Sequence, residues 1–123
     1  KLEAARPTGE ATLNIALGYG GREEIVDAAR RLVAELVESG VPPEELAEHI
    51  TDKSLGAHMY SADVPDADLI IRTSGESRLS GFLLWQSAYS EFAFINVFWP
   101  QFRRVDYLRT LRDFSQRSRR FGR

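Results

Sequence analysis

The sequence predicts an α/β fold in which a parallel sheet is covered by helices. Short apolar runs that suit buried strands alternate along the chain with longer segments whose apolar residues recur at helical spacing. The order strand, helix, strand, helix, strand, helix favours parallel strands joined by crossover helices. The chain has 123 residues and contains no internal repeat or low-complexity linker. We therefore expect residues 1–123 to form a single domain segment.

The first strand and helix are predicted in the first third of the chain. Residues 13–17 read Leu-Asn-Ile-Ala-Leu, a short apolar run that predicts a buried strand, and a glycine-rich turn follows at residues 18–21. From Arg22 the apolar residues fall on one helical face. These residues are Ile25, Ala28, Ala29, Leu32, Val33, Leu36 and Val37. The helix should end near Gly40, and residues 44–50 predict a second, short helix.

The rest of the chain predicts two further strands and two helices. Residues 51–67 follow no regular spacing, and residues 68–72, Asp-Leu-Ile-Ile-Arg, predict the second strand. Residues 82–89 are too apolar for a loop and predict a buried helix. Residues 92–98 are aromatic and β-branched, which is typical of a strand. A final helix should begin near Arg104, with one apolar side made of Val105, Leu108, Leu111 and Phe114.

Composition limits the class of protein. With 43% hydrophobic and 28% charged residues, the chain is typical of a globular protein rather than a disordered one. It has no cysteine, which excludes disulfides and thiolate metal sites and suits a reducing cytoplasm. No apolar run approaches the roughly 20 residues that a membrane-spanning helix needs.

Charge is distributed unevenly along the chain. Residues 1–102 carry 8 basic and 16 acidic side chains, a net charge of −8, whereas residues 103–123 carry 8 arginines and 2 aspartates, a net charge of +6. The basic end indicates either an anionic partner or neighbouring subunit, or a solvated arginine-rich helix. Because these arginines share a helix with an apolar face and follow an acidic body, we do not expect nucleic-acid binding.

A cluster of anion-binding side chains follows the second predicted strand. In open α/β sheets, ligands collect beyond the carboxyl ends of strands. Arg72 ends this strand, and Arg78 and Ser80 follow it closely. Guanidinium groups offer planar, paired donors to phosphate oxygens, and a hydroxyl adds another, so the cluster suits a diphosphate. The alternative is that Glu76 and Asp68 pair with the arginines as structural ion pairs; the spacing leaves both open.

Two other features are weaker candidates for binding. The glycine-rich turn of residues 18–21 opens a helix, but it lacks the dinucleotide fingerprint and the lysine of a phosphate loop, so a structural role is the more common one. Glu91 lies at a predicted strand boundary. It could face solvent, or it could contact Mg²⁺ beside a diphosphate. His49 and His58 have no metal-ligand spacing.

Several long motifs, in order, resemble the cis-prenyltransferase (undecaprenyl diphosphate synthase) family. They occupy residues 13–22, 65–76, 78–86, 89–91 and 99–100. The resemblance runs from about residue 11 to the end of the chain. It implies the C-terminal portion of the cis-prenyltransferase fold, with the N-terminal half absent. That missing half would supply the aspartate that binds the allylic diphosphate through Mg²⁺, so the catalytic residues are expected outside this sequence.

The resemblance implies an enzyme and a site. Members of the family condense isopentenyl diphosphate with an allylic diphosphate such as geranyl or farnesyl diphosphate, forming a cis double bond and releasing diphosphate. By resemblance, Arg72, Arg78 and Ser80, with the Leu79 backbone, hold the diphosphate of isopentenyl diphosphate. Glu91 is assigned to Mg²⁺ in the same way. The chemistry asked of these groups is positioning and charge neutralisation.

The resemblance also implies a partner and a location. Arg120 and Gly122 resemble the family's Arg-x-Gly motif, which reaches across a homodimer towards the partner's substrate. A cytoplasmic enzyme is expected, with peripheral association at the inner face of the membrane.

Two positions bear on the subtype. Gly18 and Gly81 stand where many long-chain members have asparagine, and together with the motifs of residues 18–22 and 76–80 they favour a short-chain enzyme that makes Z,E-farnesyl diphosphate. The alanine- and arginine-rich composition resembles that of actinobacterial members. Ser77 stands where some relatives have a histidine near the metal, which leaves a second local metal ligand open. The alternatives are a long-chain decaprenyl or undecaprenyl diphosphate synthase and a non-catalytic scaffold subunit of the same fold.

Overall fold

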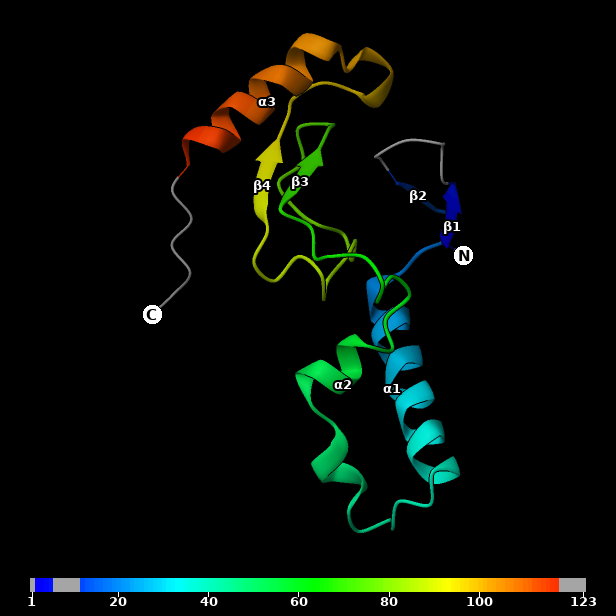
Figure 1. Ribbon diagram of the computed structural model, residues 1–123. Helices are drawn as coiled ribbons and strands as arrows, with labels where there is room; N and C mark the ends of the chain where they lie inside the picture. Colours follow the sequence, from blue (N-terminus) through cyan, green and yellow to red (C-terminus); the bar gives the residue numbers. More distant parts are fainter. Residues whose placement is uncertain (1, 6–11, 118–123) are drawn as a thin grey trace. The chain divides into compact units, whose positions relative to one another are not determined.

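A computed structural model describes residues 2–5 and 12–117 of the chain (Figure 1). The chain divides into two compact units, Lys1–Pro65 and Asp66–Arg123, and each is described by itself. The expectation of a single domain stays a prediction. Within residues 2–5 and 12–117, no helix is both long and apolar enough to cross a membrane.

The first unit begins with a two-stranded antiparallel sheet. Strand β1 (Leu2–Ala5) pairs with β2 (Leu13–Ala16), with Leu2 opposite Ala16 and Ala5 opposite Leu13. A strand is confirmed at residues 13–16, but its predicted burial is wrong: Leu13 and Ile15 are 59% and 48% exposed. Its antiparallel partner β1 was not predicted, because the four residues Leu-Glu-Ala-Ala carry no clear strand pattern.

The helix predicted from the apolar spacing after Arg22 is confirmed as α1 (Gly21–Glu38). Ala28 and Leu32 are buried on its inner face, at 0% and 3% exposure, as the pattern predicts. The helix ends as predicted at Gly40, whose φ of 80° suits glycine. The amides of Gly40 and Val41 donate to carbonyls of the last helical turn, both at 3.0 Å. This pair of bonds satisfies carbonyl groups that the helix itself leaves unpaired.

A short 3-10 helix and a short α-helix follow α1. The helix predicted at residues 44–50 is the 3-10 helix η1 (Leu46–His49). Helix α2 (Asp52–Gly56) lies in the segment for which no regular structure was predicted. Its signal is a capping box: Thr51 and Ser54 each accept a hydrogen bond from the other's backbone amide, at 3.0 and 2.8 Å. Both helices contact α1.

The second unit contains a parallel strand pair and a terminal helix. Strand β3 (Leu69–Arg72) pairs in parallel with β4 (Glu91–Phe94), with Leu69 opposite Glu91 and Arg72 opposite Phe94. A 3-10 helix, η2 (Trp99–Gln101), leads into α3 (Arg104–Gln116). The parallel pairing and the final helix are therefore confirmed, although β4 is shorter than the predicted strand at residues 92–98.

Helix α3 buries a narrower face than the sequence predicts. Leu111 and Phe114 are half-buried and Thr110 is buried. Val105 and Leu108, which the helical spacing places on the same side, are 40% and 50% exposed. In the first turn, Asp106 accepts hydrogen bonds from the backbone and the guanidinium of Arg103.

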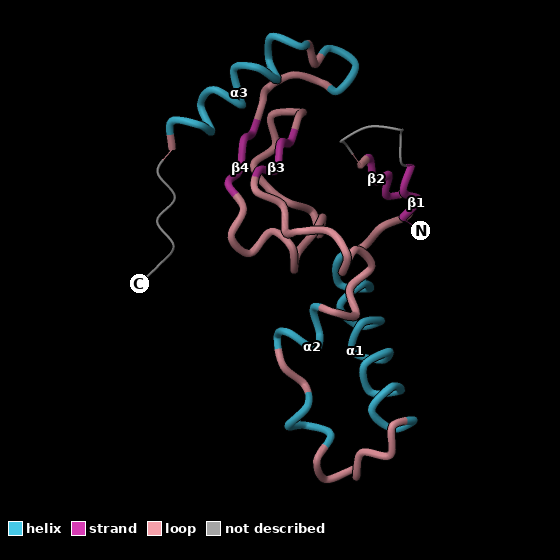
Figure 2. Tube along the Cα trace, viewed as in Figure 1, coloured by secondary structure: helices cyan, strands magenta, loops and turns pink. Residues whose placement is uncertain are grey.

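The helix predicted at residues 82–89 is wrong: this segment is a series of turns within the long loop that joins β3 to β4 (Figure 2). Ser80, Gly81 and Leu83 have φ angles of 51°, 82° and 48°, in the left-handed region, which prevents a right-handed helix from starting there. Apolar composition predicted burial, but Phe82 and Tyr89 are 44% and 78% exposed, and the buried residues of the segment are the polar Gln86 and Ser87. Composition could not reveal the backbone angles that decide the conformation.

Candidate functional site

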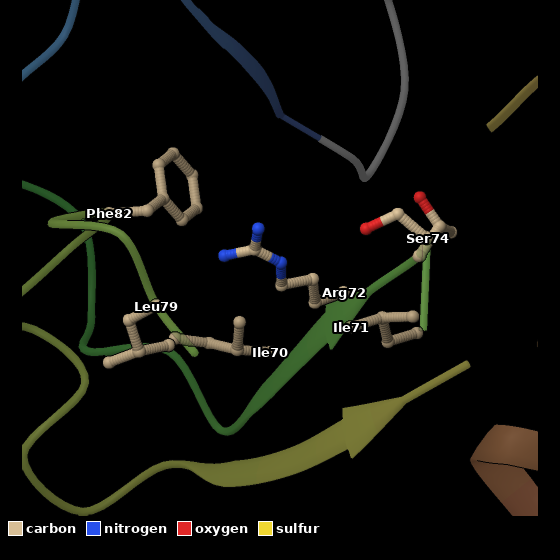
Figure 3. Close-up of a pocket in the computed structure, with 7 residues that line it drawn as sticks. Ile70, Ile71, Arg72, Ser74, Leu79 and Phe82 are labelled. Carbon is tan, nitrogen blue, oxygen red and sulfur yellow. The ribbon is translucent and has the colours of Figure 1, made fainter. Parts of the chain in front are cut away.

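The side chain of Arg72 projects from the carboxyl end of β3 into a cavity (Figure 3). The cavity has a volume of about 350 Å³ and is lined by residues 70–74 together with Leu79 and Phe82. Figure 3 shows the Arg72 guanidinium directed towards the chain segment that carries Leu79 and Phe82. The volume lies in the range that small-molecule sites occupy. The structure therefore places the predicted strand-end arginine in a pocket.

The loop after β3 folds back onto the Arg72 guanidinium. Nη1 of Arg72 donates a hydrogen bond to the carbonyl oxygen of Arg78 and another to Oγ of Ser80, the latter at 2.9 Å. The reversal uses left-handed backbone angles at both ends of the loop, including φ values of 85° at Ser74 and 51° at Ser80. The structure thus brings together Arg72, Arg78 and Ser80, which the sequence predicted as one cluster.

The start of this loop is fixed to the segment that follows β4. The amide of Ser74 donates to the carbonyl of Val97 at 2.7 Å, and the amide of Gly75 donates to the carbonyl of Ile95 at 3.0 Å. Gly75 has a φ of 72°, and a Cβ atom added there would lie 2.6 Å from Oδ1 of Asn96. The left-handed angle favours glycine, whereas the Asn96 side chain could shift to accommodate a Cβ atom. Backbone contacts therefore hold the loop in place.

Glu76 joins the two arginines of the loop. One carboxylate oxygen accepts a hydrogen bond from Nη2 of Arg72, and the other accepts one from Nη2 of Arg78 at 2.6 Å. The side chains are partly exposed: 23% for Arg72, 38% for Glu76 and 66% for Arg78. The sequence left open that the arginines form structural ion pairs instead of an anion site, and the structure contains such pairs with Glu76. It occurs beside the cavity, so it does not exclude anion binding there.

Glu91 lies away from this loop in the described structure. It begins β4, whereas Arg72 ends the parallel strand β3, so the two residues occupy opposite ends of the ladder, roughly 10 Å apart along the strands. The Glu91 carboxylate accepts a hydrogen bond from Nη1 of Arg117 at 2.9 Å. Within residues 2–5 and 12–117, no group of three or more His, Asp or Glu side chains could hold a metal ion. The Mg²⁺ role of Glu91 stays a prediction.

The glycine-rich turn of residues 18–21 opens α1, and acidic side chains occupy the first turn of that helix. Glu24 is 1% exposed and accepts hydrogen bonds from the hydroxyl of Tyr19 and, at 2.9 Å, from the amide of Tyr60. The Tyr60 hydroxyl donates to Asp27 at 2.7 Å, which lowers the pKa of the Asp27 carboxyl and raises the pKa of the Tyr60 phenol. These contacts indicate a structural role for the turn, which is the role that the sequence favoured.

Two predicted site residues, Arg120 and Gly122, lie outside the described residues. Leu79 lines the cavity through the same loop that carries Arg78 and Ser80. The backbone role expected of Leu79 stays a prediction.

Comparison with known proteins decides the family. Residues 1–122 match a family model described as "Putative undecaprenyl diphosphate synthase". The chain belongs to the undecaprenyl diphosphate synthase family. The family that the motifs predicted is thereby confirmed, and the cluster of Arg72, Arg78 and Ser80 lies within the matched residues.

Relatives from several organisms share this sequence. An isoprenyl transferase of Thermus thermophilus is 63% identical over 111 residues, which are 90% of this chain and 42% of the relative. A (2Z,6E)-farnesyl diphosphate synthase of Mycolicibacterium smegmatis is 56% identical over 110 residues, 89% of this chain and 42% of the relative. The chain thus spans less than half the length of these curated relatives.

A solved structure of the family shares the fold. Lavandulyl diphosphate synthase from Lavandula x intermedia, in complex with dimethylallyl diphosphate, superposes with a TM-score of 0.77 at 36% sequence identity. The match covers 88% of this chain and 45% of that protein. Together with the parallel pairing of β3 and β4, this similarity confirms the predicted α/β fold.

Proposed function

We propose that this chain binds isopentenyl diphosphate as part of a cis-prenyltransferase. The enzyme would condense isopentenyl diphosphate with an allylic diphosphate to give a Z-isoprenyl diphosphate. The observation that carries the proposal is the folded-back loop, in which the Arg72 guanidinium contacts Ser80 Oγ at 2.9 Å and the carbonyl of Arg78 beside a cavity at the end of β3. Family membership and relatives named as isoprenyl transferases support it.

The residues of this chain would act by binding and by neutralising charge. In the condensation, the bond between C1 of the allylic substrate and its diphosphate breaks, and C1 joins C4 of isopentenyl diphosphate. A proton then leaves C2, and free diphosphate is released. The isopentenyl unit keeps its own diphosphate throughout. Arg72 and Arg78, with the hydroxyl of Ser80, would hold that group so that C4 is fixed for attack.

Mg²⁺ is the cofactor proposed for this reaction, and Glu91 would hold it. The Glu91 side chain is 32% exposed and is a single carboxylate paired with Arg117. One carboxylate suits Mg²⁺, which takes its other ligands from phosphate oxygens and water. The ion would neutralise phosphate charge when bound.

We propose a short-chain product, Z,E-farnesyl diphosphate. Gly18 and Gly81, together with the mycolicibacterial relative named as a (2Z,6E)-farnesyl diphosphate synthase, support this product. The Thermus relative is named only as an isoprenyl transferase, so a long-chain product is the alternative. Chromatography of products made by the complete protein from isopentenyl diphosphate with geranyl or farnesyl diphosphate separates the two, because chain length is read directly.

We also propose that the working enzyme is a homodimer, supported by the match of Arg120 and Gly122 to the Arg-x-Gly motif. The proposed location is the cytoplasm, at the inner face of the membrane. Mixing the Arg72→Ala and Arg120→Ala proteins tests the dimer at an isopentenyl diphosphate concentration below the wild-type KM, where each variant alone should have little activity: hybrid dimers with one intact site should regain activity if Arg120 acts on the partner's substrate. Unchanged inactivity of the mixture would count against it.

Alanine variants of the two arginines test the binding proposal in the complete protein. Arg72→Ala or Arg78→Ala removes charge-assisted hydrogen bonds to the diphosphate, so KM for isopentenyl diphosphate should rise about 10- to 100-fold. KM for the allylic substrate should change little. Arg30→Ala is the matched control, because Arg30 is 76% exposed on α1 and is not part of the loop. Wild-type kinetics in both loop variants would overturn the binding proposal. Activity of the complete wild-type protein would exclude the alternative of a non-catalytic scaffold subunit.

A further inference from the structure

Glu76 contacts both arginines of the proposed diphosphate site. We infer that this carboxylate is an internal competitor of the substrate: it holds Arg72 and Arg78 when no diphosphate is bound and eases release of the product's diphosphate. The inference rests on the proposed function and assigns a role to a residue that the proposed binding set leaves out.

The competition follows from the atoms involved. Glu76 accepts hydrogen bonds from Nη2 of Arg72 and from Nη2 of Arg78, the latter at 2.6 Å. Nη1 of Arg72 is already bonded to the loop through Ser80 Oγ and the carbonyl of Arg78. A diphosphate that bridges the two guanidinium groups would meet the Glu76 carboxylate at the Nη2 donors, where the two anions repel each other and compete for the same positive charges.

The arginines need an anion when the substrate is absent. The Arg72 side chain is only 23% exposed, and leaving such a charge without a partner is unfavourable. Glu76 supplies that partner from within the same loop, so the guanidinium groups keep their positions between turnovers. A site held in its binding geometry loses less conformational entropy when the ligand arrives.

The partial exposure of the group keeps the contact exchangeable. Glu76 is 38% exposed and Arg78 is 66% exposed, and ion pairs with this degree of solvation are weak. A diphosphate carries more charge than one carboxylate and offers more acceptor oxygens to the same donors. It can displace Glu76, yet Glu76 remains attached to the loop and returns when the ligand dissociates.

Product release is a necessary step at this site, because the diphosphate bound here becomes part of the product. In the proposed condensation, the diphosphate that enters on isopentenyl diphosphate stays on the elongated product. The product has to leave this site before another isopentenyl diphosphate can bind. A competing carboxylate weakens the hold on the product and therefore speeds its departure.

Glu76→Gln in the complete protein tests the inference, because it keeps the shape of the side chain and removes its charge. Dissociation constants for inorganic diphosphate and isopentenyl diphosphate are measured by isothermal titration calorimetry. Both should fall about three- to tenfold, since two weak ion pairs no longer oppose binding. Glu44→Gln, which removes an exposed charge outside the loop, is the matched control and should leave both constants unchanged. Unchanged or weaker binding by Glu76→Gln overturns the inference, because a merely structural carboxylate would weaken the site when lost.

Kinetics add a second readout. Glu76→Gln should lower KM for isopentenyl diphosphate and also lower kcat, with a burst of product in the first turnover as release becomes slower; an unchanged kcat without a burst overturns the release role. Glu76→Asp keeps the charge but is one methylene too short to reach both guanidinium groups, so its affinity should fall between those of wild type and Glu76→Gln. The Glu76→Asp variant provides the test if Glu76→Gln does not fold. Failure of the proposed function would appear separately, as diphosphate binding that Arg78→Ala does not weaken.

Discussion

Two glutamates, one in each compact unit, show opposite uses of a carboxylate. Glu24 is 1% exposed and is bonded to neutral donors, the Tyr19 hydroxyl and the Tyr60 amide. Glu76 has a side chain that is 38% exposed and is bonded to two charged arginines on its own loop. Removing the first leaves the part-buried Tyr19 hydroxyl and Tyr60 amide without an acceptor, whereas removing the second leaves guanidinium groups that water or a ligand can reach.

The backbone around each glutamate shows the same contrast. Glu24 stands in the first turn of α1, where regular helical bonds fix its position. Glu76 stands in a loop between residues with left-handed angles, Gly75 at 72° and Ser80 at 51°. Such angles cost energy in residues other than glycine and persist where surrounding contacts hold them, which is common at binding sites. The buried carboxyl group is held by the fold of its unit, whereas the partly exposed one on a constrained loop is available for exchange.

The largest expected effect separates the two glutamates by stability. Glu24→Ala leaves the Tyr60 amide and the Tyr19 hydroxyl without their acceptor, so the free energy of unfolding should fall by about 3 kcal/mol. Glu76→Ala should lower it by only about 1 kcal/mol, because Arg78 is largely solvated and the half-buried Arg72 keeps its bonds to Ser80 and to the carbonyl of Arg78. Urea unfolding of the complete protein measures both. Equal losses in the two variants would break the comparison.

A smaller effect is expected from the hydroxyl of the loop. Ser80→Ala removes a donor for the diphosphate and the partner of Arg72 Nη1, so affinity for isopentenyl diphosphate should fall about fivefold. Ser80→Gly also lacks the hydroxyl but tolerates the φ of 51° better than alanine does. A fall in affinity shared by both variants assigns the effect to the hydroxyl. Wild-type affinity in Ser80→Gly would assign it to backbone strain instead.

The smallest expected effect concerns pH and lies in the first unit. The Ser54 carbonyl and the Glu35 carboxylate, both 2.8 Å from the His58 ring, raise the pKa of His58 above its ordinary 6.5, against a smaller opposing effect of Arg31. Protonated His58 therefore stabilises the fold fully below about pH 6.5, and this contribution is lost as pH rises through the folded pKa.

Glu35→Gln sharpens this expectation because it removes one of the two groups that raise the pKa of His58. Urea midpoints of the complete protein at pH 5.5 and 8.5 measure the effect. The midpoint of the wild type should decline with pH more than that of the variant. The difference should be small, since Glu35 is 68% exposed. Parallel pH profiles would show that the contact between Glu35 and His58 carries no pH dependence.

Local patterns predicted most of the regular elements. The spacing that includes Ala28 and Leu32 predicted α1, because one buried face repeats every 3.6 residues, and Gly40 predicted its end. Residues 68–72 predicted β3 through an unbroken apolar run. The turns at residues 82–89 were missed because an apolar composition suits either a helix or a series of turns, and composition does not encode the φ angles.

Motifs along the chain are enough to assign the family, and the residue types of Arg72, Arg78 and Ser80 predict an anion site, because motifs and residue types are properties of the chain alone. Only the tertiary structure decided which anion these arginines hold without a ligand and where Glu91 lies. Hydrogen bonds from Ser74 and Gly75 to the segment after β4 fold the loop so that Glu76 meets both guanidinium groups. Strand register places Glu91 at the other end of the ladder, where it contacts Arg117. Such placements depend on contacts between residues far apart in the sequence, and no local pattern specifies them.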